Sequence, residues 1–320
     1  MTQDTMLGRP LADSSTYLKL SLVAMIWGGT FVAGRYISGE TPPLLSASLR
    51  FLLAGGVLGL YLLISGQGFV RLTRPQLFKL IGLGFCGIFA YNLCFFYGLH
   101  YISASRASLI VALNPAVMAI VSYLLYREHL SLSKVGGIVL CVVGAGVVLL
   151  TRLSGSLAGV EGSWIGDLLI FGCVLSWVAF SIFGKTTVKE IGALHTVTYS
   201  IMAGAAMLTV TAVGMGQFQL AAIQALPLSE MLSLVYLGVM GSAIAYIWYY
   251  NGIQKIGATR AGVFIALNPL TAVLLGGLLL GEVLSGYTFI GGVLIIVGIV
   301  VCNRPVKARS AIPAAIVRPA

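Results

Sequence analysis

The sequence predicts an all-α integral membrane protein with ten transmembrane helices, arranged as two inverted five-helix repeats around a central cavity. Three observations lead to this fold class. Of the 320 residues, 58% are hydrophobic and only 9% are charged, which is more apolar than a soluble core requires. The apolar residues fall into runs long enough to cross a bilayer. The two halves of the chain also carry the same motifs in the same order.

Ten apolar runs account for most of the chain. A helix needs about 20 largely apolar residues to span a bilayer, and such runs lie near 17–37, 44–64, 77–99, 104–125, 135–150, 164–184, 195–215, 231–253, 258–280 and 286–302. Residues 1–16 and 304–320 are predicted cytoplasmic tails, and 151–163 is the longest polar insert. We therefore expect a first repeat at 17–152 and a second at 164–303, with the function among the helices.

The repeat is visible as two related segments. A shift of 154 residues places "GLHYISASRASLIVALNP", residues 98–115, on "GIQKIGATRAGVFIALNP", residues 252–269, with nine identities in eighteen positions. The same register carries "EHLS", residues 128–131, onto "EVLS", residues 282–285. This agreement predicts that the chain consists of two related halves.

The basic residues predict how the chain sits in the membrane. With ten spans and both ends inside, fifteen Lys and Arg lie on the inner side and only Arg35, Arg50, Arg106 and Arg152 on the outer side. This bias is the one that sets membrane topology, so the net charge of +10 requires no nucleic-acid partner. We expect a multi-pass protein of the cell (inner or plasma) membrane, with both termini cytoplasmic.

An odd number of spans in each half implies that the second half enters the membrane from the opposite side. Arg106 then lies outside and its counterpart Arg260 inside. Inverted repeats around a site near the midplane are typical of secondary transporters, in which the two halves rock about the substrate. The pattern therefore predicts transport by alternating access. Duplication also builds some channels and scaffolds, which are the alternative.

Several motifs resemble a known family. The first span carries "MIWGGTFVAGR", and each half carries "A(S/T)RA…ALNP" followed by E-x-L-S. Over roughly residues 17–303, these motifs and the 5+5 arrangement resemble the EamA family of the drug/metabolite transporter superfamily. Within that family the chain is similar to the YddG-type exporters of aromatic and other neutral amino acids. The resemblance implies a central substrate cavity between the halves, alternating access, and efflux as the usual direction.

Two prolines, Pro115 and Pro269, lie near the middle of spans four and nine and are predicted hinges. A proline removes an amide donor and frees the carbonyl four residues before it. Asn114 and Asn268, directly before the prolines, can donate an amide to the loosened backbone or to a ligand. Two interpretations stay open: a kink locked by a polar side chain, or a discontinuous helix that presents polar groups to the substrate.

Aromatic and amide side chains deep in the spans are predicted to line the cavity. Buried Tyr and Asn side chains require hydrogen-bond partners, and a wall that faces a polar ligand can supply them. The predicted site comprises Trp27 and Trp177, which are equivalent under a shift of 150 residues, together with Tyr91, Asn92, Tyr246, Tyr250, Asn114 and Asn268. For the two tryptophans, core packing is an equally good interpretation.

The middle of every predicted span lacks Asp and Glu, since Asp167, Glu128 and Glu282 fall near span ends. Intramembrane carboxylates commonly mark proton or cation coupling. A phosphate carrier would need a cluster of Lys or Arg within the spans to pair its anion, and the sequence has no such cluster there. The pattern favours a neutral or zwitterionic small molecule, moved by facilitated diffusion or exchange, with proton coupling left open.

Other function classes receive little support. The three His and nine acidic residues are scattered, with no HExxH, GxSxG, Walker or Rossmann pattern, so we expect no enzyme activity. The five cysteines lie in apolar runs without CxxC spacing, which indicates packing. We expect no metal, no cofactor and no obligate protein partner, and we expect the lipid bilayer as the surroundings. The alternative function is a passive channel, or a carrier of the same superfamily that exports drugs or other metabolites.

Overall fold

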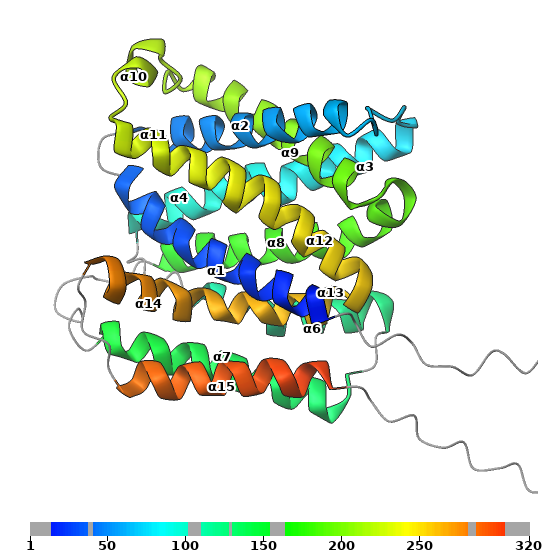
Figure 1. Cartoon of the computed structure of the whole chain (residues 1–320), viewed down its shortest axis with the longest axis vertical. Coiled ribbons are helices and arrows are strands. Elements are labelled where there is room, and N and C mark those ends of the chain that lie inside the picture. Colours follow the sequence, from blue (N-terminus) through cyan, green and yellow to red (C-terminus); the bar gives the residue numbers. More distant parts are fainter. Residues whose placement is uncertain are drawn as a thin grey trace, which may run out of the picture.

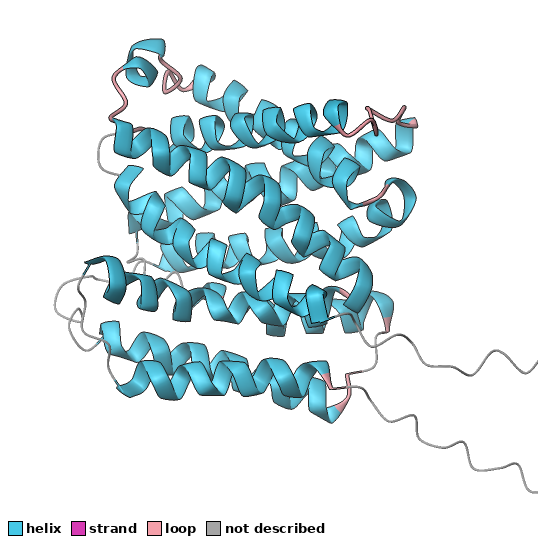
Figure 2. Ribbon diagram, in the orientation of Figure 1, coloured by secondary structure: helices cyan, strands magenta, loops and turns pink. Residues whose placement is uncertain are grey.

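The computed structural model is all-helical and describes residues 14–37, 41–101, 110–127, 130–153, 164–280 and 286–304. Figure 2 shows helices joined by short loops, and no strand occurs in these ranges. The predicted all-α class is therefore confirmed for the described part of the chain. Arg106, Glu128 and Glu282, on which part of the repeat and orientation argument depends, lie outside the described residues.

The first half contributes the blue to green helices of Figure 1. They are α1 (Ser14–Ile37), α2 (Pro43–Ile64), α3 (Arg74–Gly84), the π-helix η1 (Phe85–Ala90), α4 (Tyr91–Tyr101), α6 (Asn114–Tyr126) and α7 (Leu132–Leu153). Thr73 begins α3 with a capping box, in which Gln76 N donates to Thr73 Oγ1 at 3.4 Å and Thr73 N donates to Gln76 Oε1 at 3.0 Å. Such reciprocal bonds satisfy amides that the first helical turn leaves unpaired.

The second half contributes the green to red helices (Figure 1). They are α8 (Trp164–Ile191), α9 (Ala193–Gly214), the short α10 (Leu220–Gln224), α11 (Leu228–Val235), the π-helix η2 (Tyr236–Ile244), α12 (Ala245–Ile256), α13 (Ala258–Gly262), the 3₁₀ turn η3 (Val263–Ala266), α14 (Leu267–Leu280) and α15 (Gly286–Asn303). As in the first half, one continuous helical stretch contains a π-helical segment, here between α11 and α12.

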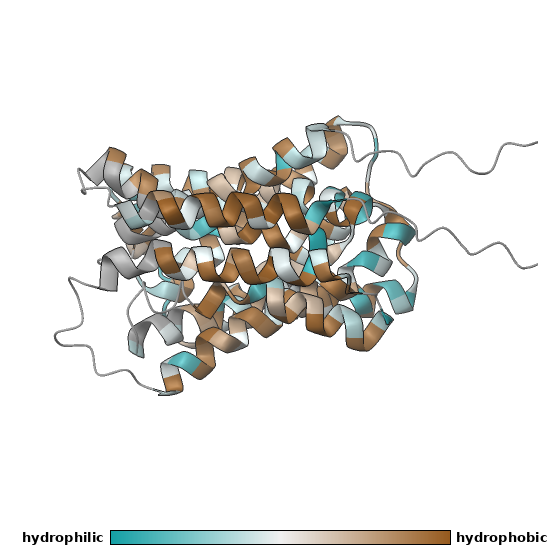
Figure 3. Cartoon of the chain, turned by 90° about the horizontal axis from the view of Figure 1, so that it is seen from below, coloured by the Kyte–Doolittle hydropathy of each residue, from teal (hydrophilic) through white to brown (hydrophobic). Residues whose placement is uncertain are grey.

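Five helical stretches are long and apolar enough to cross a membrane, namely 43–64, 74–95, 164–191, 193–214 and 228–256. Residues 114–126, 132–147 and 289–303 form shorter apolar helices. Figure 3 shows apolar residues along the middle of the helices and polar residues gathered mainly toward one end of the bundle. The start of α1 and the end of α15 lie at this same end (Figure 1). The chain thus crosses the membrane several times, whereas the count of ten spans stays a prediction.

The helix contacts follow the sequence repeat. The fifth helices of the two halves, α7 and α15, pack together at one edge of the bundle, and the second helices, α2 and α9, pack together near the other (Figure 1). Likewise α4 packs on α8 as α12 packs on α1, and α6 packs on α8 as α14 packs on α1. Each contact therefore has a counterpart with the halves exchanged, which places α1, α4, α8 and α12 in the centre.

Glycines allow the close approach of α7 and α15. A Cβ added to Gly137 would lie 2.6 Å from the Gly298 carbonyl oxygen, and one added to Gly144 would lie 2.7 Å from the Gly291 carbonyl oxygen. The shift of 154 residues carries Gly137 onto Gly291 and Gly144 onto Gly298, so the two contacts are the same contact made once from each half. Small residues at such positions let helix backbones touch.

Candidate substrate site

Two tryptophans mark the centre of the bundle. Trp27 lies near the midpoint of α1 (Ser14–Ile37) and Trp177 near the midpoint of α8 (Trp164–Ile191), and both are buried. Their ring centroids are 5.0 Å apart with the ring planes perpendicular, an edge-to-face geometry that aromatic pairs favour. Because these residues are equivalent in the repeat, the two halves meet here.

Tyrosines from the third helix of each half complete a cluster around this pair. The Trp177 ring lies 5.5 Å from Tyr246, 5.4 Å from Tyr249 and 5.9 Å from Tyr91. Trp27 lies 6.0 Å from Tyr246 and 5.2 Å from Tyr249. We call Trp27, Tyr91, Trp177, Tyr246 and Tyr249 the midplane aromatic cluster. It brings together four of the residues predicted for the site and adds Tyr249.

Tyr249 was missed although a signal existed. It follows Tyr246 by three residues on α12, and residues three apart share one face of a helix. Tyr249 is only 1% exposed, and its hydroxyl lies 3.3 Å from the Ser181 hydroxyl of α8. The cluster therefore carries hydroxyl groups as well as aromatic faces.

Two π-helical segments, which the sequence did not predict, precede these tyrosines along the chain. The shift of 154 residues carries η1 (Phe85–Ala90) onto residues 239–244, inside η2 (Tyr236–Ile244). Tyr91 directly follows η1, whereas Tyr246 and Tyr249 lie two and five residues after the end of η2. π-Helical turns are rare and occur frequently at functional sites, because they change the direction in which later side chains point.

The indole N–H groups of the two tryptophans have different partners. Trp27 Nε1 donates to the carbonyl oxygen of Gly241 in η2 at 2.9 Å. Trp177 Nε1 is buried without a hydrogen-bond partner; the Tyr249 hydroxyl is near it but not in hydrogen-bonding geometry. Buried polar groups are rarely left unpaired, and a small shift would let this N–H donate either to the Tyr249 hydroxyl or to a ligand.

Asn92 and Tyr250, both predicted for the cavity wall, bond to the backbone. Asn92 Nδ2 donates to the Ile88 carbonyl of η1 at 2.6 Å, and Tyr250 Oη donates to the Phe180 carbonyl at 2.7 Å. Tyr250 is fully buried and packs its ring on Phe180 with centroids 4.9 Å apart. In this conformation Tyr250 ties α12 to α8, whereas the Asn92 bond stays within its own helical stretch.

The Asn-Pro segment of the first half interrupts a helix. A turn at residues 112–113 precedes α6, which begins at Asn114 with Pro115 in its first turn. Asn114 Nδ2 donates to the Val111 carbonyl at 2.9 Å, which is the carbonyl that the proline leaves without its helical N–H. The side chain thus replaces the missing backbone donor.

The second half is interrupted at the equivalent place. The 3₁₀ turn η3 ends at Ala266, and α14 begins at Leu267, just before Asn268 and Pro269. Asn268 and Asn114 are both buried, and the carboxamide oxygen of each has no hydrogen-bond partner. The backbone oxygen of Asn268 lies against Gly28, next to Trp27, where an added Cβ would be 3.0 Å away. The start of α14 therefore packs closely on α1 at the residue after Trp27.

Arg50, which the charge count assigns to the outer side, reaches the same region with its side chain. It is the eighth residue of α2 (Pro43–Ile64), and its Nε donates to Ser242 Oγ at 2.8 Å. Ser242 is the midpoint of the helical stretch Leu228–Ile256. The signal was a charged residue inside an apolar run, which within a membrane commonly marks a functional site.

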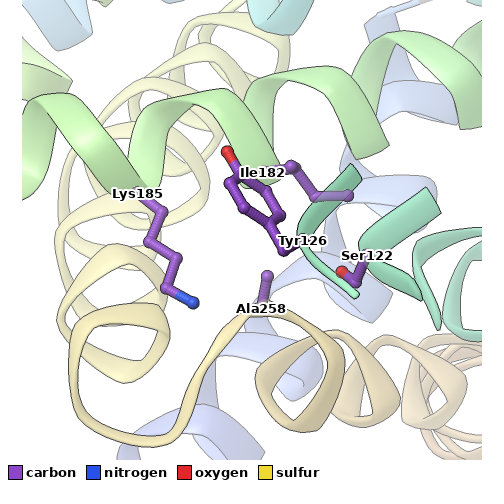
Figure 4. Close-up of a pocket in the computed structure, with 5 residues that line it drawn as sticks. All are labelled: Ser122, Tyr126, Ile182, Lys185 and Ala258. Carbon is purple, nitrogen blue, oxygen red and sulfur yellow. The ribbon is translucent and has the colours of Figure 1, made fainter. Parts of the chain in front are cut away.

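A separate pocket of about 210 Å³ lies toward the polar end of the bundle, between α6, α8 and α13 (Figure 4). It is lined by Ser122, Tyr126, Ile182, Lys185 and Ala258, and Lys185 Nζ lies 5.9 Å from the centre of the Tyr126 ring. Ligand pockets usually enclose about 300–1,000 Å³, so this hollow is small for a metabolite. It lies away from the midplane aromatic cluster.

Comparison with known proteins gives the family. The profile of the EamA-like transporter family matches residues 14–150 and again residues 164–304, nearly the whole chain. The chain belongs to this family. It is a multi-pass membrane transporter of the drug/metabolite type, and the double match coincides with the two halves found in the sequence.

Individual relatives agree with this assignment. The chain is 30% identical over 294 residues to the uncharacterized transporter YyaM of Bacillus subtilis, covering 91% of this chain and 94% of the relative. A second relative is the S-adenosylmethionine/S-adenosylhomocysteine transporter of Chlamydia trachomatis, 28% identical with 94% and 90% of the two chains covered. One crystal structure matches with a TM-score of 0.74 at 24% identity over 90% of this chain and 97% of that chain, which supports the fold.

Proposed function

We propose that this EamA-like transporter moves small neutral or zwitterionic metabolites, above all aromatic and other neutral amino acids. The observation that carries the proposal is the midplane aromatic cluster, which both halves build; the Trp177 N–H within it and the unpaired carboxamide oxygens of the buried Asn114 and Asn268 add polar groups to the interior. Aromatic faces suit an apolar side group, and amide and indole groups suit ammonium and carboxylate ends.

The proposed mechanism is alternating access, with the protein acting as an exporter or facilitative exchanger in the plasma membrane. Two inverted repeats, 17–152 and 164–303, would rock about the cluster, with both termini in the cytoplasm. Breaks before Pro115 and Pro269 lie at equivalent places in the two halves, as hinges on the two sides of one gate require. The YddG-type resemblance supports the outward direction.

A second substrate, S-adenosylmethionine or its homocysteine counterpart, is favoured by the named Chlamydia trachomatis relative. S-Adenosylmethionine joins an α-amino-acid end to an aromatic purine. It therefore presents the same two kinds of group as an aromatic amino acid, in a larger molecule. The two proposals share the amino-acid end and an aromatic group, whereas S-adenosylmethionine adds a ribose and a positively charged sulfonium, and its homocysteine counterpart adds the ribose and a neutral thioether.

Uptake into liposomes that contain the purified protein tests the proposal. We expect saturable uptake of labelled phenylalanine without an ion gradient. Uptake should be faster when unlabelled phenylalanine is inside, because an exchanging carrier then reorients with substrate bound on both its inward and its outward step. A passive channel would show neither saturation nor this acceleration. Labelled S-adenosylmethionine in parallel ranks the two substrates. Liposomes that take up no amino acid above the protein-free control would contradict the amino-acid proposal.

A further inference from the structure

We propose that Arg50 binds the carboxylate of the substrate at the midplane, beside the aromatic cluster. This inference rests on the proposed function and assigns one end of the transported zwitterion to a single side chain. It follows from the position of the guanidinium, from its unused hydrogen-bond donors and from its neighbours.

The position is deep within the bundle. Arg50 lies seven residues after the start of α2, about 10 Å along the helix, and its Nε bonds to Ser242, the midpoint of the stretch 228–256. Ser242 Oγ in turn donates to the Leu237 carbonyl within η2 at 2.9 Å. A cation at this depth is costly unless an anion or polar groups offset its burial.

The described residues supply no such anion. Their three acidic side chains engage elsewhere or start other helices: Glu190 pairs with Lys79 at 2.7 Å, Glu230 accepts a hydrogen bond from Thr41 at 2.6 Å, and Asp167 lies in the first turn of α8. Among the described residues Arg50 uses one of its five N–H donors, on Ser242, and its guanidinium lies on the Phe51 ring at 4.9 Å. The remaining donors have the planar fork geometry that binds a carboxylate through two parallel bonds.

The neighbours place this fork next to the aromatic cluster. The Phe51 ring, on which the guanidinium rests, lies 6.4 Å from the Tyr246 ring. Arg50 Nη2 also lies 3.8 Å from the position that a Cβ added to Gly241 would take, and the Gly241 carbonyl accepts the hydrogen bond from Trp27. A carboxylate held by Arg50 would therefore direct the rest of an amino acid onto the rings of the cluster.

The second half has no equivalent of this arginine. The shift of 150 residues used for the tryptophans carries Arg50 onto Ser200 of α9, a buried serine whose hydroxyl has no partner. A residue needed only for packing of the repeated helices would have a counterpart of similar size there. The asymmetry fits a ligand that carries one negative charge at one end.

The test compares substrates with and without a carboxylate. In protein-loaded liposomes, uptake of labelled phenylalanine is measured against unlabelled phenylalanine, phenylalaninamide and N-acetylphenylalanine as competitors. We expect the amide to compete at least roughly tenfold more weakly than the acid, since hydrogen bonds to charged groups are the strong ones, whereas the N-acetyl compound retains the carboxylate and competes. Arg50→Gln should abolish this preference and lower phenylalanine uptake to a similar degree, and Arg50→Lys should restore part of both.

The matched control is Arg71→Gln, the same chemical change at an exposed arginine in the turn after α2. It should leave uptake and preference unchanged. If Arg50→Gln does not insert into the membrane, the inference is tested by comparing how strongly phenylalanine and phenylalaninamide compete in Arg50→Lys and in the unmodified protein. Equal competition by acid and amide, or an Arg50→Gln variant that keeps the preference, overturns the inference while the transport function stands. No uptake of phenylalanine by the unmodified protein overturns the amino-acid function and the inference together.

Discussion

At the scale of single residues, a side chain that replaces a missing backbone donor has a structural role, whereas a buried polar atom without a partner can bind a ligand. Asn114 gives its amide to the Val111 carbonyl and keeps its carboxamide oxygen unpaired. The side chain thus repairs the backbone with one group and offers the other to the interior. The two interpretations drawn from the sequence, a locked kink and a polar presentation, are compatible in this residue.

The bond from Asn114 to the Val111 carbonyl predicts that a second substitution can offset the loss of this side chain. Asn114→Ala should lower the free energy of unfolding by about 1–3 kcal/mol, because a buried carbonyl loses its donor. Adding Pro115→Ala should recover most of this loss, since alanine restores the N–H that the helix needs at that carbonyl. Thermal unfolding of the detergent-purified protein measures both.

The matched control is Asn303→Ala. Asn303 Nδ2 donates to the Ile299 carbonyl at 2.9 Å inside the unbroken helix α15, so its loss should cost less than that of Asn114. A double variant no more stable than Asn114→Ala alone would show that the amide does not replace the missing backbone donor.

Sequence reasoning identified only part of the residue-level site. The paired tryptophans were predictable because an internal repeat carries Trp27 onto Trp177, and repeat equivalents near a pseudo-symmetry axis meet. Arg50 was not among the predicted site residues because a count of charges per loop considers only the nearest membrane face, whereas a long side chain can extend several ångströms along the helix. Which polar groups remain unpaired depends on tertiary contacts, which no repeat or motif specifies.

At the scale of elements, backbone irregularities position the site. The breaks before α6 and α14 follow from Asn-Pro and could be predicted, since proline cannot continue a helical hydrogen-bond pattern. The π-helical segments η1 and η2 could not, because no residue type demands a π turn. Both contain glycines at equivalent positions, Gly87 and Gly241, where neighbouring side chains leave little room for a Cβ.

The α7–α15 contact gives a prediction with opposite signs at adjacent glycines. Gly137→Ala would place a Cβ 2.5 Å from Cys302 N and 2.6 Å from the Gly298 oxygen, so the helices must separate, at a cost of about 1–3 kcal/mol. Gly136→Ala meets nothing within 4 Å and should stabilise the helix by roughly 0.5–1 kcal/mol. Thermal unfolding in one detergent compares them, and equal effects of the two changes would contradict the packing described.

At the scale of the whole molecule, the helices pack as two related halves but the bonds at the centre are not symmetric. Trp27 has a backbone acceptor and Trp177 has none, and Arg50 has no counterpart in α9. A carrier with inverted halves is expected to be asymmetric in any one conformation, because one side of the gate is closed while the other is open. The all-helical class and the family were predictable from the composition and the repeated motifs, whereas the ten inverted spans and their orientation in the membrane stay predictions.

The proposed site depends on the inversion of the two halves. Cysteine accessibility tests this inversion directly. The turn after α2 and the turn after α9 lie at opposite ends of the bundle (Figure 1), and Gln67 and Gln219 are exposed in or beside them. Cells that express Gln67→Cys or Gln219→Cys are treated with a membrane-impermeant maleimide, with the unmodified protein and its five cysteines as background. We predict that Gln219→Cys is labelled in intact cells and Gln67→Cys only after permeabilisation. Labelling of both from the same side would contradict the inverted arrangement and the midplane site built on it.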